Sequence, residues 1–255
     1  MSNAATPAPQ VAEVVTKPAS AAPLIKSTGI TMLDRNLGGG IPSGSVIYFL
    51  ADPMSMAEVF LYQFTQARKT YYFTTERRPK FVEKDINNLN FKINNVVFID
   101  IYSEYYMTPH GEMVDNVGNE YVDSKIVEFT EYHLHKIRNL AEHEVNVIID
   151  SFSFYLSLNV NPGRIKRLLN IIYEMTKETE ALTFLYSMKG AYKNEILTEV
   201  LKVSDVIFDI ELGKSADKIV NRLSVPKIRG MTPNGEVIKF KVGEGINIDT
   251  STDIA

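Results

Sequence analysis

Residues 46–64 read VIYFLADPMSMAEVFLYQF, and this stretch decides the fold. Residues 46–50 are apolar without a break, which predicts a strand that is covered on both faces. A turn is expected at Asp52 and Pro53, and from about Ala57 the apolar residues recur at the spacing of a helix. The stretch therefore predicts a strand, a short loop and a helix, in that order.

This order of elements is the setting of a phosphate-binding loop, which normally reads G-x-x-x-x-G-K-[ST]. In such a loop the glycines let the backbone curl around phosphates, the lysine meets their charge and the hydroxyl holds Mg²⁺. Here Ala51 and Met56 stand at the two glycine positions. Ala57 stands at the lysine position and Glu58 at the hydroxyl position. We interpret the loop as a nucleotide site that has lost its phosphate-binding groups.

The flanks of this stretch carry a longer pattern. Residues 27–46 read STGITMLDRNLGGGIPSGSV, and residues 222–230 read RLSVPKIRG. The first segment resembles T-G-I-x-x-L-D-x-x-L-G-G-G-I-P-x-G-S and the second contains K-x-R-G, two patterns of the KaiC-like branch of the RecA/RadA ATPase superfamily. Phe240 and residues 245–248 resemble the closing strands of that family. The resemblance covers residues 26–248, nearly the whole chain.

This resemblance implies an α/β fold of the RecA-like three-layer type. Such a fold has a mainly parallel sheet with helices on both faces and antiparallel strands at the C-terminal end. The residue pattern agrees with this fold. Strand-like runs alternate with helical patterns up to about residue 203, and after that residue the strand-like runs succeed one another without a helix between them. We expect one domain over residues 26–250 and a disordered tail over residues 1–25, which is either an inert extension or a docking arm.

The same pattern places the individual elements. The expected strands are 46–50, 70–75, 96–101, 145–151, 181–187, 205–212, 219–228 and 237–242. The expected helices are 58–68, 79–89, 121–143, 162–178 and 195–203. Residues 102–117 are polar and rich in tyrosine, and we expect a long loop that either forms an aromatic lid or packs against the domain.

The resemblance also assigns the catalytic side of the site. KaiC-like ATPases carry two adjacent glutamates after the second strand, which activate the attacking water. Glu76 matches the first of them, whereas Arg77 replaces the second with a guanidinium that cannot act as a general base. Asp150 matches the aspartate that binds Mg²⁺ in a working site. The alternative is a strand-end aspartate that is kept for hydrogen bonding.

From these departures we predict no catalytic residue and no metal site, but a vestigial nucleotide pocket. The pocket comprises Asp52, Pro53, Met54, Ser55, Met56, Ala57, Glu58, Glu76 and Asp150. The helix dipole favours a carboxylate at Glu58, and we expect this group to take the place of phosphate, with a Lys or Arg neutralising it. His133 and His135 lie two positions apart on a helix and so do not share a face that could hold a metal.

Lys227 and Arg229 retain the K-x-R pattern. In KaiC-like assemblies this pair reaches across a subunit interface to the phosphates of the neighbouring subunit. One interpretation is that the pair still inserts into the site of an active partner. The other is that both residues form ordinary ion pairs on an exposed strand, which contribute little to stability.

The composition limits the class of protein. The chain has 255 residues, 45% hydrophobic content, a formal net charge of −4 and no cysteine. These values fit one large α/β domain and exclude disulfides and thiolate metal sites. The acidic balance argues against a nucleic-acid partner, and no apolar run is long enough to span a membrane. We expect a soluble cytoplasmic protein.

Three functions remain open. The first is an inactivated KaiC-like homologue that serves as a regulatory or scaffold subunit in archaeal or bacterial signal transduction and needs no cofactor. Its protein partner is either a second copy, in a homo-oligomer, or an active KaiC-like paralogue. The second function is weak binding or hydrolysis of ATP with Mg²⁺ through the altered loop. The third, a DNA-binding filament of the RadA type, disagrees with the acidic balance.

Overall fold

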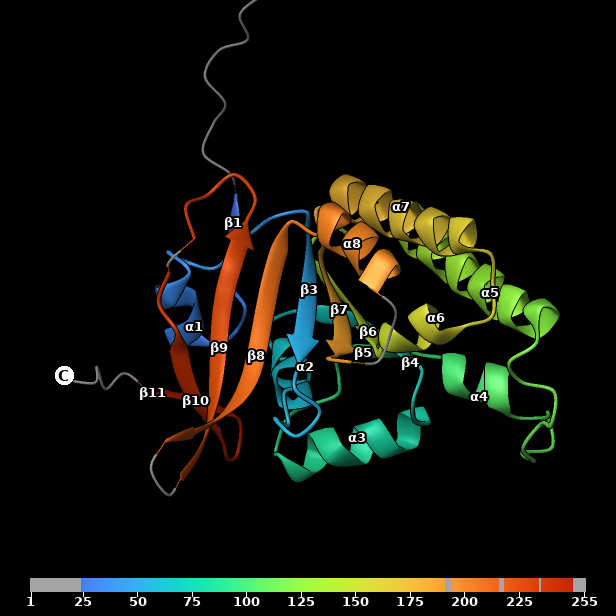
Figure 1. Ribbon diagram of the computed structural model, residues 1–255, viewed down its shortest axis with the longest axis horizontal. Helices are drawn as coiled ribbons and strands as arrows, with labels where there is room; N and C mark the ends of the chain where they lie inside the picture. The colour runs from blue at the N-terminus through green and yellow to red at the C-terminus, as the bar shows by residue number, and fades with distance from the viewer. Residues whose placement is uncertain (1–23, 191–193, 216–217, 234, 250–255) are drawn as a thin grey trace, which may run out of the picture.

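The computed structural model describes residues 24–190, 194–215, 218–233 and 235–249. Its main feature is a nine-stranded sheet in the order β11-β10-β9-β8-β3-β7-β6-β4-β5 (Figure 1). The six parallel strands are β3 (Ser45–Ala51), β4 (Lys69–Thr74), β5 (Val96–Asp100), β6 (Val145–Asp150), β7 (Leu182–Met188) and β8 (Val206–Ser215). The antiparallel flank consists of β9 (Lys218–Ile228), β10 (Ile238–Val242) and β11 (Ile246–Asp249).

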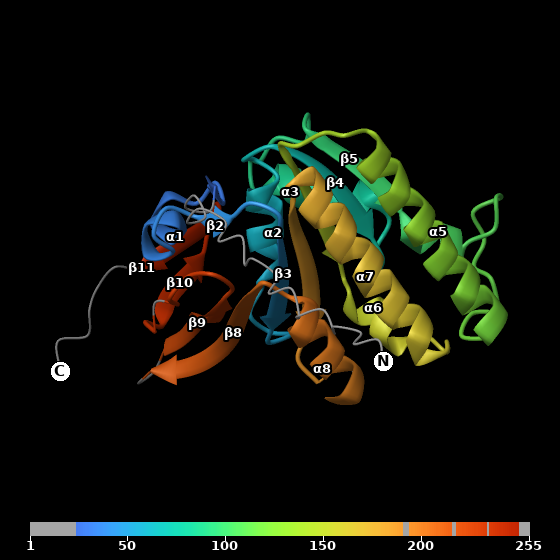
Figure 2. The same ribbon diagram turned by 90° about the horizontal axis from the view of Figure 1, so that it is seen from above.

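Helices cover both faces of this sheet (Figure 2). One layer contains α2 (Glu58–Phe64) and α3 (Pro79–Asn88). The other contains α5 (Glu120–Asn139), α7 (Pro162–Thr179) and α8 (Asn194–Val203). Each layer buries its own hydrophobic cluster against the sheet. The predicted three-layer α/β fold with an antiparallel C-terminal flank is confirmed.

The strand β3 shows why residues 46–50 are apolar without a break. Ile47 and Phe49 belong to the cluster under α2, whereas Val46 and Tyr48 belong to the cluster under α5 and α7. Successive side chains of a strand point to opposite faces, so a strand in the middle of a three-layer domain needs apolar residues at every position. Phe49 is fully buried and lies 5.2 Å from the ring of Phe208 in β8.

Residues 102–117 do not form one continuous loop as predicted. The helix α4 (Ile101–Tyr106) starts directly after β5, and the carboxylate of Asp100 caps it by accepting the N–H of Ser103 at 2.8 Å. Tyr105 is 5% exposed and packs edge-on against Phe154 of α6 (Ser153–Ser157), a short helix that was not predicted either. The tyrosines here pack against the domain, which favours the second of the two interpretations for this segment.

The helix α5 ends four residues earlier than the predicted residue 143. Its last helical residue is Asn139, and Ala141 then adopts a left-handed conformation with φ 49°. Leu140, which follows Ile137 at helical spacing and continues the apolar pattern, is 50% exposed. Spacing alone cannot show such an ending, because the apolar pattern continues past the point where the backbone turns away.

The N-terminal part of the domain forms a separate two-stranded sheet. Here β1 (Ile25–Lys26) pairs with β2 (Ile41–Pro42), and the unpredicted helix α1 (Thr31–Asn36) lies between them. Gly40 has φ 139°, and a Cβ there would lie 2.2 Å from the carbonyl oxygen of Lys26. Only glycine fits this approach. The expected tail, residues 1–25, lies outside the described residues except for its last two positions.

None of the helices in the described residues is both long and apolar enough to cross a membrane.

Candidate functional site

The loop between β3 and α2 closes on itself through Asp52. The carboxylate of Asp52 accepts the backbone N–H of Met54 at 2.9 Å. Its carbonyl oxygen accepts both the N–H and the hydroxyl of Ser55, at 3.0 and 2.6 Å. In a phosphate-binding loop, backbone N–H groups of this kind point at the ligand. In this loop, part of that donor set is already bound to a carboxylate of the chain.

The backbone nevertheless keeps a feature of a glycine-rich loop. Met56, at the second glycine position, has φ 52°, a left-handed conformation that is uncommon for a residue other than glycine. The side chains of Met54 and Met56 are 73% and 55% exposed. Ala57, at the lysine position, is fully buried. The turn is therefore present, whereas the side chains that would bind phosphate are not.

The first turn of α2 carries Glu58, which is half-buried. The N-cap residue Ala57 makes no side-chain capping bond, so a negative charge here lies near the unsatisfied N–H groups of the helix start. Burial, followed by the charge of Glu58, raises the pKa of Tyr186 in β7. Among the described residues, no Lys or Arg forms an ion pair with Glu58, so its expected neutralisation stays a prediction.

Asp150 lies at the carboxyl end of β6 and is 7% exposed. The hydroxyl of Tyr72 in β4 donates to its Oδ2 atom at 2.7 Å. The Nη2 atom of Arg77 lies 4.0 Å from the same oxygen. Burial raises the pKa of Asp150, while the bond from Tyr72 and the charge of Arg77 oppose that rise. Both contacts go to the Oδ2 atom of Asp150, so this oxygen already has protein partners.

Arg77 is held in place by two further contacts. Its Nη2 donates to the hydroxyl of Tyr62 in α2 at 2.6 Å, and its Nη1 donates to Asp85 in α3 at 2.5 Å. Burial, followed by the charge of Asp150, raises the pKa of Tyr62, so this tyrosine is a neutral hydroxyl. The guanidinium therefore joins α2, α3 and the end of β6 in one hydrogen-bonded and charged cluster.

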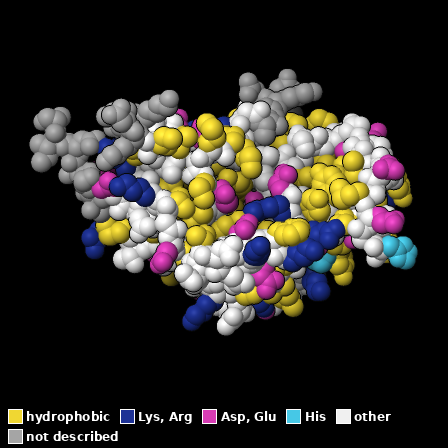
Figure 3. Space-filling model, turned by 90° about the horizontal axis from the view of Figure 1, so that it is seen from below, with side chains coloured by type: hydrophobic (Ala, Val, Ile, Leu, Met, Phe, Trp, Pro, Cys, Tyr) yellow, Lys and Arg dark blue, Asp and Glu magenta, His cyan; other side chains and the backbone are white. Residues whose placement is uncertain are grey.

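Glu76, two positions after the end of β4, is exposed to solvent beside this cluster. Desolvation by the surrounding protein and then the charge of Asp150 raise its pKa, and the charge of Arg77 opposes the rise. The loop 52–58, Glu76 and Asp150 all lie at the carboxyl ends of β3, β4 and β6, on one end of the sheet, and their grouping into one nucleotide pocket stays a prediction. At this end of the molecule, Lys and Arg side chains are interspersed with Asp, Glu and hydrophobic ones (Figure 3).

The residues of this pocket do not fit a nucleotide triphosphate with Mg²⁺. The lysine and hydroxyl positions hold Ala57 and Glu58, the N–H of Met54 is bound by Asp52, and Asp150 is bound by Tyr72. A phosphate-bound metal needs a carboxylate that is free to accept it and a protein cation or N–H groups for the phosphates. Among the described residues, no cluster of three metal-ligating side chains is present.

Lys227 and Arg229 lie at the opposite end of the sheet from this pocket, because Lys227 pairs with Ile207 at the start of β8. The ammonium of Lys227 donates to the carbonyl oxygen of Leu201 at 2.8 Å. Arg229 donates to the carbonyl oxygen of Lys202 at 2.8 Å. Both cations thus bind the last carbonyls of α8, where a helix leaves them unsatisfied and its dipole is negative. Their role in a partner's site stays a prediction.

The residues that hold the cluster together were missed by the sequence analysis. Tyr62 lies four positions after Glu58 in α2, so helical spacing places both side chains on one face of the helix. This spacing was the one signal from which a role of Tyr62 at the site could have been predicted. Tyr72 and Asp85 gave no such signal, because their contacts depend on how β4 and α3 pack. Arg77 was noted only as a departure from the glutamate pair, without a partner.

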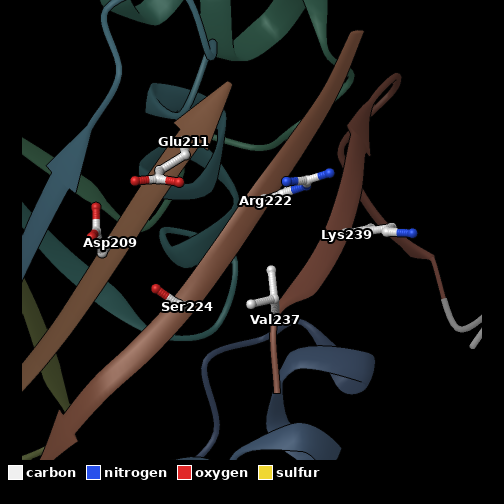
Figure 4. A pocket seen from close by; sticks show the side chains of 6 residues that line it. All are labelled: Asp209, Glu211, Arg222, Ser224, Val237 and Lys239. Atoms are coloured by element: carbon white, nitrogen blue, oxygen red, sulfur yellow. The ribbon is translucent and has the colours of Figure 1, made fainter. Parts of the chain in front are cut away.

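Two other hollows lie away from this pocket. One, of about 350 Å³, lies on the outer face of the antiparallel strands, and its lining includes a cross-strand row formed by Glu211, Arg222 and Lys239 (Figure 4). The other, of about 690 Å³, lies beside the edge strand β5 and is lined by Phe98, Phe129 and His133 among others. The first mixes both charges, as solvated sheet faces commonly do, and neither continues into the pocket at the end of β3.

The sheet order and the two helical layers give this chain a RecA-like fold. Within that class, the chain belongs to the family of unknown function DUF7125, whose sequence profile matches residues 25–255. A search among curated proteins gives no significant match.

Two solved structures illustrate the similarity. The KaiC-like protein PH0186 of the hyperthermophilic archaeon Pyrococcus horikoshii OT3 superposes with a TM-score of 0.69 at 15% identity, covering 89% of this chain and 100% of that one. The flagellar accessory protein FlaH of Methanocaldococcus jannaschii superposes with a TM-score of 0.66 at 19% identity, covering 86% of this chain and 96% of that one. At these identities the likeness establishes the fold alone.

Proposed function

We propose that this chain is a KaiC-like homologue that does not turn over ATP and acts as a regulatory or scaffold subunit in signal transduction. One observation carries the proposal: the loop that would hold phosphate is closed by the carboxylate of its own Asp52. Ala57 and Glu58 at the lysine and hydroxyl positions act in the same direction, because they remove a cation and add a negative charge. Like charges about 4 Å apart repel by about 1 kcal/mol in water and by several times that in a sheltered site.

A protein that keeps the framework of an assembly-forming ATPase but lacks the phosphate site is suited to binding other subunits. The partner we propose is a second copy of the chain or an active KaiC-like paralogue. FlaH, which shares the fold, is described as an accessory protein, and a role beside another protein is of the kind proposed here. The proposal involves no cofactor and places the protein in the cytoplasm.

Calorimetry with ATP and Mg²⁺ tests the loss of the phosphate site. We expect no saturable heat at millimolar nucleotide, because neither Ala57 nor Glu58 can bind phosphate or its metal. The matched control is the double variant Ala57→Lys/Glu58→Thr, which restores the two missing groups of the loop and should bind more tightly than the natural chain. Saturable binding to the natural chain would contradict the proposal.

That result would favour the second candidate, weak ATP binding through the altered loop. Two observations support this alternative: Glu76 remains accessible to solvent, and Asp150 remains at the end of β6. Both are positions that the resemblance assigns to the catalytic side. A phosphate-release assay on the natural chain, with Asp150→Asn as the control, separates binding from turnover.

A further inference from the structure

The guanidinium of Arg77 lies among groups from four elements. It donates to Tyr62 in α2 and to Asp85 in α3, it lies three positions after the end of β4, and it is 4.0 Å from Asp150 at the end of β6. These contacts meet at the carboxyl ends of the parallel strands, where open α/β sheets bind their ligands. The position is also the one at which the chain departs from the glutamate pair of KaiC-like ATPases.

We propose that Arg77 is a built-in counter-ion that replaces a bound metal at Asp150 and holds this end of the sheet together without nucleotide. The inference rests on the proposed function, because it assumes a pocket that no longer binds ATP with Mg²⁺. It assigns Arg77 a positioning role and not a catalytic one.

The burial of Asp150 makes such a counter-ion necessary. A carboxylate that is 7% exposed is costly unless it is hydrogen-bonded and lies near an opposite charge. Tyr72 supplies one hydrogen bond but no charge. Arginine suits the second task because its planar fork can bind Tyr62 and Asp85 at the same time as it faces Asp150, and because it stays protonated.

A simpler reading is that Arg77 only forms a surface ion pair with Asp85. The side chains of Arg77 and Asp85 are 38% and 42% exposed, and exposed pairs contribute little. The two readings differ in one measurable quantity, the coupling between Arg77 and Asp150. A surface pair with Asp85 predicts no coupling, whereas a counter-ion for Asp150 predicts a large one.

A double-mutant cycle measures this coupling. The thermal midpoint of unfolding is recorded for the natural chain, Arg77→Gln, Asp150→Asn and the double variant, in EDTA and without nucleotide. We expect Arg77→Gln to lower the midpoint by on the order of 5 °C, because Asp150 then keeps a buried charge without a counter-ion. Adding Asp150→Asn should restore most of that loss, and Arg77→Lys, which keeps the charge, should lose less.

Arg78→Gln is the matched control, since it removes the same charge one position along the chain. If Arg77→Gln and Arg78→Gln shift the midpoint equally, or if Asp150→Asn does not rescue Arg77→Gln, the proposal is wrong. A second arm replaces EDTA by millimolar Mg²⁺, which should leave the midpoint of the natural chain unchanged. A rise in that midpoint would overturn the role of Arg77 as the replacement for a metal. Because no nucleotide is present in either arm, failure here differs from failure of the calorimetric test.

Discussion

Asp205 shows how one residue can join distant parts of the chain. It is 3% exposed, and its Oδ2 atom accepts the N–H of Val46 at 3.0 Å and the ammonium of Lys177 at 2.7 Å. Its Oδ1 atom lies 3.0 Å from Nε of Arg229. The carboxylate therefore links the start of β3 to α7 and to the end of β9. Two hydrogen bonds and an ion pair with Arg229 at one buried carboxylate make its removal costly.

We expect Asp205→Ala to lower the free energy of unfolding by about 2–4 kcal/mol, because it leaves the N–H of Val46 without its acceptor and removes the ion pair with Lys177. Urea titration measures the change. Asp209→Ala is the control, since Asp209 pairs with Lys189 at a partly exposed position and should cost less than about 1 kcal/mol. Equal losses for the two variants would contradict the role assigned to Asp205.

The sequence located only those residues of the candidate site whose positions follow from the succession of strands and loops along the chain. The loop 52–58 and Asp150 sit at strand ends, so a motif alignment locates them without knowledge of packing. The Tyr72 contact to Asp150 joins residues 78 positions apart, and nothing in the local pattern signals it. The Asp52 bond to Met54 is local, but the motif comparison counted missing groups and overlooked the new acceptor.

At the scale of elements, the packing of α5 against α7 places a carboxylate in an unfavourable position. Glu131 is 8% exposed and lies 3.2 Å from the mostly exposed Arg167. Burial raises the pKa of Glu131, and Arg167 opposes that rise only in part. A raised folded-state pKa means that the contribution of this group to stability is full below the unfolded-state pKa of about 4.3. That contribution is lost as the pH rises through the folded-state pKa.

Glu131→Gln should therefore gain stability relative to the natural chain as the pH rises from about 4 to 7. The gain should stay below about 1 kcal/mol because Arg167 and solvent screen the charge. Urea midpoints at several pH values measure the effect. Glu128→Gln should show the opposite trend, since hydrogen bonds from Lys125 and Arg164 lower the pKa of Glu128. Parallel pH trends in the two variants would show that the burial of Glu131 has no such consequence.

The boundaries of the elements illustrate a different limit of sequence reasoning. The run 96–101 was predicted as one strand, yet the chain turns into α4 at Ile101 because Asp100 caps it. An aspartate before a polar, tyrosine-rich segment is compatible with both a loop and a helix start. The packing of Tyr105 on Phe154 decides between them, and that contact joins segments far apart in the chain.

At the scale of the whole molecule, the sequence was sufficient for the architecture. Apolar runs without alternation identified the buried parallel strands, and the unbroken series of strands after residue 203 identified the antiparallel flank. The order of the strands within the sheet was not predicted, because periodicity shows which face a residue occupies but not which strand is its neighbour.

How the chain assembles with other subunits is also a question about the whole molecule, and a substitution of Arg229 tests it. If the K-x-R pair reaches into the site of an active partner, Arg229→Ala should lower the ATPase rate of that partner several-fold while this chain stays folded. The assay runs well below the thermal midpoint, because Arg229 also binds the end of α8. Arg222→Ala, on the same strand, is the control. An unchanged partner rate would leave Arg229 with its contacts to α8 and Asp205, a structural role within this chain.

The central place of β3 has a consequence for synthesis of the chain on the ribosome. The neighbours of β3 in the sheet are β7 and β8, which end at residues 188 and 215, whereas β3 ends at residue 51. At translation rates of about 5–20 residues per second, β3 waits roughly 10–30 s for its second neighbour to emerge. Until β7 emerges, the nascent chain carries an unpaired strand with five consecutive apolar side chains at residues 46–50, and until β8 emerges one edge of that strand stays open. Its yield in cells should therefore depend on chaperones that bind nascent chains.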